Sequence, residues 1–421
     1  MLMKKQGSVG NSGMTLCALL LGAASAHAQF NVLYSFGGEG DGLNPMGALT
    51  ISGATLYGTT VAGGTGGNGN NGTVFQINTN GAGYNRMYQF MGWNNYDGSQ
   101  PMRAMTLDNG TLYGGTTAGG YPDKGTVFKI DTNGTYGVLH GFGVGNTRGN
   151  MPYGALAISG STLFGTTYQS DGVNNGLVFK MGTDGNDFNL LHEFSWGAQA
   201  DGVAPGALTL AGSTLYGMAA YGGANNKGDV FKLNTDGSGF SVLHSFTSSD
   251  GTCPMLNALT LSGSTLYGLA YTGGNNNKGT VFKLDTDGTG FSVLHTFAGG
   301  ETDGNSPNGA LTLVGSTLFG TTISGGTNDA GTVFQLNTDG TDFQLLHSFA
   351  GGTEDGATPY DGLVYADGAL YGTTYAGGAN NGGVVYSLGV SVVPEPVSGM
   401  LVLAGLGVMT LVRRRRHSSR P

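Results

Sequence analysis

The sequence repeats one unit of about 50 residues seven times. Each copy carries the marker Thr-Leu-Tyr-Gly or a close variant, whose final glycine falls at Gly58, Gly114, Gly165, Gly217, Gly268, Gly320 and Gly372. The steps between these glycines are 56, 51, 52, 51, 52 and 52 residues. A fixed period of this length is typical of propellers and related arrays, in which each unit buries its apolar faces against its neighbours.

One complete copy, Ala258–Phe297, shows what each unit builds. It contains four short segments rich in Val, Leu, Thr and aromatic residues and bounded by Gly, Asn, Asp or Ser, which predict β-strands. These segments are Ala258–Leu261, Ser264–Gly268, Gly279–Leu284 and Phe291–Phe297. An Asp-Gly pair between the last two supplies the positive φ that a tight hairpin needs. Four antiparallel strands joined in this way form one propeller blade.

The two ends of the repeat array predict how the ring closes. The last copy stops after its third segment, Gly383–Leu388, whereas Phe30–Phe36 matches a fourth strand and has no repeat before it. If the first strand of each blade lies nearest the axis, Phe30–Phe36 forms the outer edge of the last blade. The sequence therefore predicts an all-β, seven-bladed propeller of four-stranded blades over residues 29–390, closed by its N-terminal strand.

Charge restricts the partners of this domain. Between Gln29 and Pro396, seven Lys and three Arg stand against 26 acidic residues, a net charge of −16. Such an acidic domain disfavours nucleic acid and anionic membrane surfaces as partners. It is compatible with cations, with a surface polysaccharide or other neutral glycan, or with solubility alone.

The N-terminus predicts a secretory signal peptide over residues 1–28. Lys4 and Lys5 precede an apolar run, Met14–Ala24, and Ala26 and Ala28 form an A-x-A site for signal peptidase. The alternative is an uncleaved anchor, for which the apolar run is short. Cleavage removes Cys17 and leaves Cys253, which predicts either an inert loop thiol or a pair between molecules.

The C-terminal segment, residues 391–421, departs from the repeat. An apolar run over residues 397–412 predicts a transmembrane helix, and the Arg cluster after it predicts that the propeller lies outside the inner membrane. A simple tail anchor explains these features. Together with the preceding Pro-Glu-Pro, however, they resemble the PEP-CTERM sorting tail of Gram-negative bacteria. The resemblance rests on Pro394, Glu395, Pro396, Arg413, Arg414, Arg415 and Arg416. It implies cutting by an exosortase and passage to the cell surface or the extracellular space.

The repeat itself also resembles a known family. The pieces TLYGTT, a Gly- and Asn-rich loop, and GTVFKLNTDGTGF are similar to the GloVer tandem repeat of Gloeobacter and Verrucomicrobia. That resemblance covers Phe30–Leu388 and implies a surface-associated repeat protein without an established activity. Kelch propellers are the other candidate with this period, but the chain lacks their regularly spaced Trp, having only Trp93 and Trp196.

Five histidines recur at one position of the fourth strand, and tyrosines replace them in the other two copies. They are His140, His192, His244, His295 and His347, with Tyr34 and Tyr88 as the replacements. A metal site needs ligands that converge within a few ångströms, whereas equivalent positions on different blades point apart. Alternation places His244 on one face with Phe240, Val242 and Phe246, so we expect these rings to pack between blades. The recurrent Lys129, Lys180, Lys232 and Lys283, with Gln76 and Gln335, fit a solvated strand position.

The loop that leaves each fourth strand carries the motif Asp-Gly-x-x-Pro. Its aspartates are Asp41, Asp97, Asp201, Asp250, Asp303 and Asp355, and one copy has Arg148 at this place. These loops share a face with the Gly- and Asn-rich loops after the second strand, several of which carry a tyrosine: Tyr121, Tyr168, Tyr221, Tyr271 and Tyr375. An Asp before Gly often caps its own turn. The alternative is a ligand-binding ring of carboxylates, amides and aromatics, suited to a glycan or to Ca²⁺.

The sequence predicts a non-enzymatic binding or scaffold propeller, with no cofactor and no nucleic acid partner. The alternative is a secreted carbohydrate-active enzyme with its site at the mouth of the ring. An active site requires residues that do not repeat, and the candidates are Trp93, Arg103, Arg148, Trp196, Glu301 and Glu354. Their clustering favours the enzyme and their scatter favours the scaffold.

Overall fold

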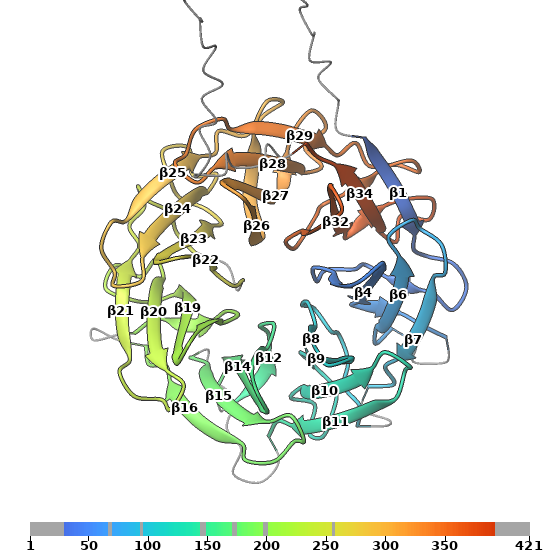
Figure 1. The fold of residues 1–421 in the computed structure, drawn as a ribbon, viewed down its shortest axis with the longest axis horizontal. Coiled ribbons are helices and arrows are strands. Elements are labelled where there is room, and N and C mark those ends of the chain that lie inside the picture. Colours follow the sequence, from blue (N-terminus) through green and yellow to red (C-terminus); the bar gives the residue numbers. More distant parts are fainter. Residues whose placement is uncertain are drawn as a thin grey trace, which may run out of the picture.

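The chain forms a ring of seven four-stranded blades around a central axis (Figure 1). The structure is a computed structural model that describes residues 29–65, 70–92, 96–143, 149–170, 175–196, 201–254 and 257–391. Within these residues every regular element is a β-strand. The predicted fold is therefore confirmed.

Each blade is an antiparallel meander whose first strand lies innermost. Blade 1 contains β3 (Thr50–Ser52), β4 (Thr55–Thr60), β6 (Thr73–Asn78) and β7 (Asn85–Gln89). Blade 2 contains β8 (Thr106–Asp108), β9 (Thr111–Thr116), β10 (Thr126–Asp131) and β11 (Tyr136–Gly141). Blade 3 contains β13 (Ala157–Ser159), β14 (Thr162–Gln169), β15 (Leu177–Gly182) and β16 (Asn189–Glu193). Blade 4 contains β18 (Thr209–Ala211), β19 (Thr214–Tyr221), β20 (Asp229–Asn234) and β21 (Ser241–Ser245).

The remaining three blades follow the same pattern. Blade 5 contains β22 (Thr260–Ser262), β23 (Thr265–Ala270), β24 (Thr280–Asp285) and β25 (Ser292–Thr296). Blade 6 contains β26 (Gly304–Val314), β27 (Thr317–Gly325), β28 (Thr332–Asn337) and β29 (Gln344–Ser348). Blade 7 contains β31 (Val364–Ala366), β32 (Ala369–Thr374), β34 (Val384–Gly389) and β1 (Phe30–Ser35).

The N-terminal strand closes the ring, as the sequence predicts. β1 pairs antiparallel with β34 and places Phe30 opposite Leu388 and Ser35 opposite Val384. The two strands lie side by side although they come from opposite ends of the propeller (Figure 1). Hydrogen bonds between the first and last strands thus complete the seventh blade.

The innermost strand is longer than the sequence suggests. Part of the Asp-Gly-x-x-Pro loop pairs with the extension of the second strand, as in β12 (Asn150–Pro152) and β17 (Val203–Pro205). In blades 1 and 7 this pairing forms separate ribbons of β2 (Gly42–Leu43) with β5 (Ala62–Gly63) and of β30 (Gly356–Ala357) with β33 (Ala376–Gly377). The two kinds of loop therefore hold one another on the same face of the ring.

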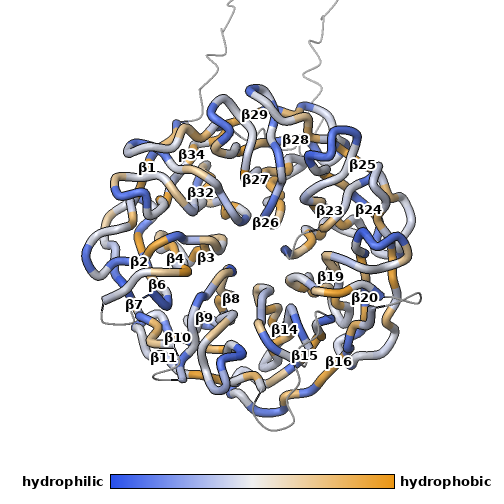
Figure 2. Tube along the Cα trace, turned by 180° about the vertical axis from the view of Figure 1, so that it is seen from behind, coloured by the Kyte–Doolittle hydropathy of each residue, from blue (hydrophilic) through white to orange (hydrophobic). Residues whose placement is uncertain are grey.

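Within the described residues the core consists of seven apolar layers, one between each pair of neighbouring blades, and a small further cluster around Ala204 and Ala220. The layer between blades 4 and 5, for example, joins Val230 to Phe246 and Phe282. A Cβ at Gly268 would stand 2.4 Å from the ring of Phe282, so the last residue of the marker must be glycine to admit that ring. In Figure 2 the hydrophobic residues concentrate along the strands and the hydrophilic residues along the connecting turns.

Both predicted targeting segments lie outside the described residues, namely the signal peptide at 1–28 and the sorting tail with its helix at 397–412. Across the part of the chain that the structure describes, no helix has the length and hydrophobicity needed to cross a membrane.

Candidate functional site

Six of the seven recurrent His or Tyr side chains hydrogen-bond to the aspartate of the loop that follows them. The Nε2–Oδ distances are 2.6 Å for His192 with Asp201, 3.1 Å for His244 with Asp250, 3.3 Å for His295 with Asp303 and 3.2 Å for His347 with Asp355. The tyrosine hydroxyls donate to Asp41 from Tyr34 at 3.0 Å and to Asp97 from Tyr88 at 2.6 Å. Tyrosine replaces histidine at this position because both side chains reach the same carboxylate.

The same rings stack on an aromatic ring of the next blade, which confirms the predicted packing between blades. The centroid separations are 3.9 Å for His347–Phe30, 3.8 Å for Tyr34–Tyr84, 3.9 Å for Tyr88–Tyr136, 4.2 Å for His140–Phe188, 3.8 Å for His192–Phe240, 3.6 Å for His244–Phe291 and 3.8 Å for His295–Phe343. Every junction between blades has one such stack.

The predicted strict alternation of side chains along the fourth strand is wrong, however. A register shift between Val230 and Phe231 leaves His244 opposite Val230 and Val242 opposite Phe231. This bulge turns Val242 outward, and its side chain is 38 % exposed. The histidine still faces the junction because the bulge lies directly before it.

His140 is the exception, and it shows how the aspartate affects the buried imidazole at the other positions. Its loop has Arg148 in place of Asp, and within the described residues its Nε2 is buried without a hydrogen-bond partner. Burial lowers the pKa of His140 to about 4. For His244, burial also lowers the pKa, but the Asp250 carboxylate opposes this effect. The aspartate thus offsets the cost of burying the imidazole.

The loop aspartates also accept hydrogen bonds from backbone amides of their own turn. Asp303 accepts hydrogen bonds from the amides of Ala298 at 2.8 Å and Gly304 at 2.7 Å. Asp355 accepts the equivalent bonds from Ala350 at 2.9 Å and Gly356 at 2.7 Å. The structure therefore brings each aspartate to its own turn and not to the other aspartates. Within the described ranges, no three His, Cys, Asp or Glu side chains gather as ligands for a metal ion.

The proline of the motif fastens each blade to the preceding one. The residue before it has a positive φ in all seven copies: Asn44, Gln100, Met151, Ala204, Cys253, Ser306 and Thr358. Its amide donates to a carbonyl of the previous blade, for example from Ser306 to Lys278 at 2.9 Å. A Cβ at Gly279 would lie 2.4 Å from Cδ of Pro307, so this glycine makes room for the proline. The motif is therefore a clip between blades.

The Asn- and Gly-rich loops also satisfy their own polar groups. Asn277 accepts a hydrogen bond from the amide of Gly273 at 3.1 Å, and Asn381 accepts one from Gly377 at 2.9 Å. Both asparagines have a positive φ, which Asn tolerates better than most residues. Asn277 and Asn381 therefore use a side-chain oxygen to hold their own loops.

Four of the five predicted tyrosines gather near the axis, together with two others. Tyr153 and Tyr168 lie 6.0 Å apart between ring centroids, and Tyr360 and Tyr375 lie 5.6 Å apart. Burial raises the pKa of Tyr360, and the nearby Tyr271, Tyr153 and Tyr375 raise it further. We call this set, which is made up of Tyr153, Tyr168, Tyr221, Tyr271, Tyr360 and Tyr375, the axial tyrosine cluster.

Two side chains of the cluster remain well exposed, Tyr221 at 44 % and Tyr375 at 36 %. Tyr221 lies beside Cys253, which together with burial raises the pKa of that tyrosine. Tyr121 does not belong to the cluster. It is 57 % exposed and packs edge-on against Tyr96 at 5.9 Å.

Arg103 contacts the axial tyrosine cluster and links residues of several blades around the axis. Its Nη1 donates to Oδ1 of Asn257 at 3.0 Å and lies 3.8 Å from Oδ2 of Asp361. Its guanidinium also stands over the ring of Tyr153, 4.6 Å from the centroid. Because these residues belong to blades 2, 5, 7 and 3, the opening between the ribbons in Figure 1 is bridged by side chains.

Arg103 was among the non-repeating candidates of the sequence analysis, but Asn257 and Asp361 were missed although the sequence carried a signal for them. Two residues before the first-strand Leu or Met, four copies have glycine: Gly47, Gly154, Gly206 and Gly309. The other three have Arg103, Asn257 and Asp361. Comparing the copies position by position finds all three, although only the ring shows that they meet.

The other non-repeating residues do not join this group. Trp196 is 62 % exposed beyond the outer strand of blade 3. Glu301 and Glu354 are exposed in the loops that follow blades 5 and 6. Trp93 and Arg148 lie outside the described residues.

Several solved structures are similar to this chain. The chain resembles an oligogalacturonate lyase in complex with manganese, with 11% identity and a TM-score of 0.50 over 86% of this chain and 96% of that one. It also resembles the computationally designed Ika8 protein, with 14% identity and a TM-score of 0.47 over 85% and 99% of the two chains. A nidogen/laminin complex has 14% identity and a TM-score of 0.38 over 63% of this chain and 84% of that one. At these identities the likeness concerns the fold alone.

At the level of sequence, no curated protein matches the chain. Residues 19–174, 65–274, 145–327 and 211–393 do match the family model of the Gloeobacter/Verrucomicrobia repeat. These overlapping matches run from residue 19 to residue 393 and include every blade of the ring. The chain therefore belongs to the Gloeobacter/Verrucomicrobia repeat family.

Proposed function

We propose that this protein is a non-enzymatic binding and scaffold propeller of the cell surface or extracellular matrix, and that it holds a glycan on the axial tyrosine cluster. The observation that carries this proposal is the gathering of six tyrosines from blades 3, 4, 5 and 7 next to Arg103. The cluster interrupts the repeat, since the positions equivalent to Tyr168 and Tyr271 hold Val61, Thr117 and Ile323 in blades 1, 2 and 6.

The chemistry of tyrosine suits a sugar. Its ring offers an apolar face for the C–H groups of a pyranose, and its hydroxyl donates to or accepts from the sugar hydroxyls. The exposed rings of Tyr221 and Tyr375 supply such faces at the surface. Ca²⁺ is a weaker proposal, since the loop carboxylates it requires already bind the rings and amides of their own blades.

The two ends of the chain support a route to the surface. In this proposal signal peptidase cuts after Ala28, the helix at 397–412 holds the propeller outside the inner membrane, and an exosortase acts near Pro394–Pro396. Mass spectrometry of the protein from outer-membrane and medium fractions tests this route. A chain that starts at Gln29 and lacks the Arg cluster supports it, whereas an intact tail in the inner membrane contradicts it.

The alternative function, a carbohydrate-active enzyme, needs paired carboxylates about 5 to 9.5 Å apart. The non-repeating Glu301 and Glu354 lie on loops of different blades. Release of reducing ends from a bound polysaccharide would favour the enzyme over the scaffold.

A glycan array tests the binding proposal. We expect the mature protein to bind at least one glycan class and the Tyr221→Ala/Tyr271→Ala/Tyr375→Ala variant to lose that binding more than tenfold. Tyr121→Ala is the matched control, because Tyr121 lies on the same face but outside the cluster. Arrays run with Ca²⁺ and with chelator decide the calcium question. Equal loss in the control and the triple variant, or binding by none of the proteins, overturns the proposal.

A further inference from the structure

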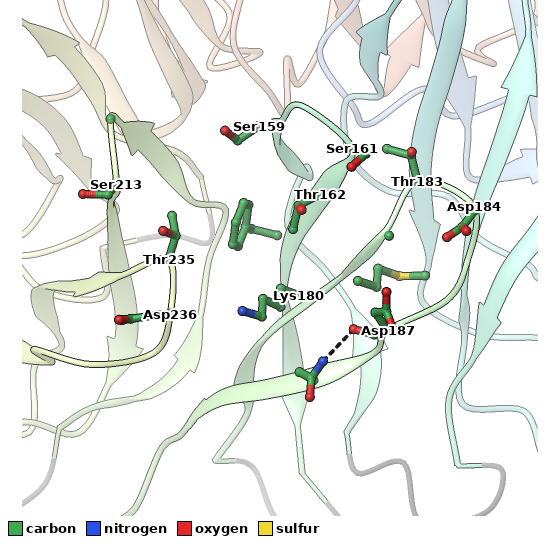
Figure 3. Close-up of a pocket in the computed structure, with 15 residues that line it drawn as sticks. Ser159, Ser161, Thr162, Lys180, Thr183, Asp184, Asp187, Ser213, Thr235 and Asp236 are labelled. Atoms are coloured by element: carbon green, nitrogen blue, oxygen red, sulfur yellow. Dashed lines mark hydrogen bonds between the residues drawn. The ribbon is translucent and has the colours of Figure 1, made fainter.

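A polar cavity of about 860 Å³ lies between blades 3 and 4 (Figure 3). Its wall consists of the turns that join the first strand to the second and the third to the fourth. In an antiparallel meander these turns lie at the end of the blade opposite to the axial tyrosine cluster. The cavity is therefore separate from the site proposed above, and its size falls within the ordinary range of ligand sites, about 300 to 1,000 Å³.

One side chain distinguishes the lining of this cavity from the equivalent position in five other blades. Phe164 lines it at the position where five other blades have a tyrosine: Tyr57, Tyr113, Tyr216, Tyr267 and Tyr371. In blade 5 burial raises the pKa of Tyr267, and the nearby Thr338 of the neighbouring blade lowers it in part. The equivalent threonine across from Phe164 is Thr235, which has no tyrosine hydroxyl to meet and lines the cavity.

Phe319 in blade 6 also replaces the tyrosine, but its surroundings differ. It faces blade 7, where β34 ends at Gly389 and β1 begins at Phe30, so no turn joins the third strand to the fourth. Phe164 is thus a phenylalanine that faces a complete turn of the next blade. Phe319 supplies a natural control for it.

The lining offers many groups to a polyhydroxylated ligand. Hydroxyl groups come from Ser159, Ser161, Thr162, Thr183, Ser213 and Thr235. Figure 3 shows Lys180 between the two turns, with Asp236 on one side and Asp184 and Asp187 on the other. Hydrogen bonds from Ser238 lower the pKa of Asp236, and those from Asn186 lower the pKa of Asp184, so both are ionised at neutral pH. Three carboxylates against one ammonium group disfavour an anionic ligand.

We propose that this cavity binds a short saccharide without negative charge, whose hydroxyls hydrogen-bond to the serine and threonine side chains of the lining. The proposal does not depend on the axial tyrosine cluster, because the two sites lie at opposite ends of the blades. The protein then holds sugars on both faces of the ring.

Isothermal titration calorimetry with three trisaccharides tests this site. The trimers of N-acetylglucosamine, glucosamine and galacturonic acid have comparable size and carry neutral, positive and negative charge. We expect the first two to bind, and galacturonic acid trimer to bind at least tenfold more weakly. Phe164→Tyr should weaken binding at least tenfold, since it adds a hydroxyl to the lining at the position where five other blades carry one. Because five blades already hold tyrosine here, this variant keeps the fold.

Three controls make the outcome decisive. Phe319→Tyr adds the same atom away from the cavity and should leave binding unchanged. Thr235→Val removes a lining hydroxyl with little change in volume and should weaken binding severalfold. The triple tyrosine variant of the axial cluster should bind these trimers as the unaltered protein does. Absence of binding, equal binding by Phe164→Tyr, or equal binding of the acidic trimer overturns the proposal.

Discussion

The imidazole of His244 lies parallel to the ring of Phe291 in the next blade, at 3.6 Å between centroids and 7° between planes. The other edge of the same imidazole hydrogen-bonds to Asp250 in its own blade. One side chain therefore couples the loop that leaves a blade to the blade that follows. Repetition of this relation around the ring explains why His and Asp recur together in the sequence.

Replacement of His244 should depend on the ability to keep both contacts. His244→Ala leaves Asp250 without its partner and Phe291 without its stack, and we expect a loss of about 1–3 kcal/mol in the free energy of unfolding. His244→Tyr should cost less than about 1 kcal/mol, because Tyr34 and Tyr88 make the same two contacts elsewhere. Urea denaturation measures both values. A tyrosine variant as unstable as the alanine variant would contradict this role.

The buried carboxyl group of Asp229 should make the stability of the fold fall as the pH rises. It is fully buried where four other blades have threonine, and neither carboxylate oxygen has a hydrogen-bond partner within the described residues. Burial raises its pKa to about 6, although the nearby Ser245 offsets part of the effect. A carboxyl whose pKa is higher in the folded than in the unfolded state holds its proton more tightly when folded. Its deprotonation therefore destabilises the fold as pH rises from about 4 through 6.

Asp229→Thr should remove this penalty. The variant reproduces blade 5, where Thr280 stands opposite Ala270 and donates to the carbonyl of Asp250 at 2.9 Å. We expect a gain of about 1–3 kcal/mol at pH 8 and a much smaller gain at pH 4.5. Thermal unfolding at the two pH values checks the difference. A gain that is the same at both pH values would mean that the carboxylate is not the cause.

Arg103 and Asp361 should depend on one another. Arg103→Gly leaves the buried Asp361 without its cation, and loss of such a partner costs about 3–5 kcal/mol. The double variant Arg103→Gly/Asp361→Gly restores the residue that four other blades carry, and should be more stable than the single variant. A double-mutant cycle of unfolding free energies measures the coupling. Additive losses would show that the two side chains act independently.

Gly268 should tolerate no side chain. The Cβ of Gly268→Ala would meet the ring of Phe282 at 2.4 Å and the side chain of Leu259 at 2.8 Å. Overpacking of this kind costs about 1–3 kcal/mol. Gly263→Ala is the control, because Gly263 belongs to the same blade and a Cβ there meets nothing within 4 Å. Its φ of +55° adds some backbone strain to that variant. Equal stability of Gly268→Ala and the unaltered protein would contradict the close approach.

The strands, the number of blades and the closure were accessible from sequence because the repeat fixes each of them seven times. Copy-to-copy replacement of His by Tyr likewise revealed a packing position. The clip at Asp-Gly-x-x-Pro was not accessible, since residues as different as Met151 and Ser306 share its positive φ. That backbone conformation is held by a hydrogen bond to a carbonyl of the preceding blade, so the identity of the residue does not predict it.

Groups of side chains that come from distant parts of the chain could not be predicted from the sequence either. Arg103 and Asn257 are 154 residues apart and meet because the ring places blades 2 and 5 around one axis. The cavity beside Phe164 lies at a junction where phenylalanine replaces the tyrosine of five other blades. Such features arise from departures from the repeat, whereas motif reading follows what the copies share.

The most direct test of the account compares binding with stability in two variants of the mature protein. Asp250→Asn removes a clip carboxylate, and the triple alanine variant of Tyr221, Tyr271 and Tyr375 removes exposed and half-buried rings of the axial cluster. Affinity for the best glycan from the array and Tm should be measured for both. The account predicts that Asp250→Asn lowers Tm and keeps the affinity, and that the tyrosine variant keeps Tm within a few degrees and loses the affinity. Loss of affinity in a folded Asp250→Asn protein, with normal binding by the tyrosine variant, would contradict it.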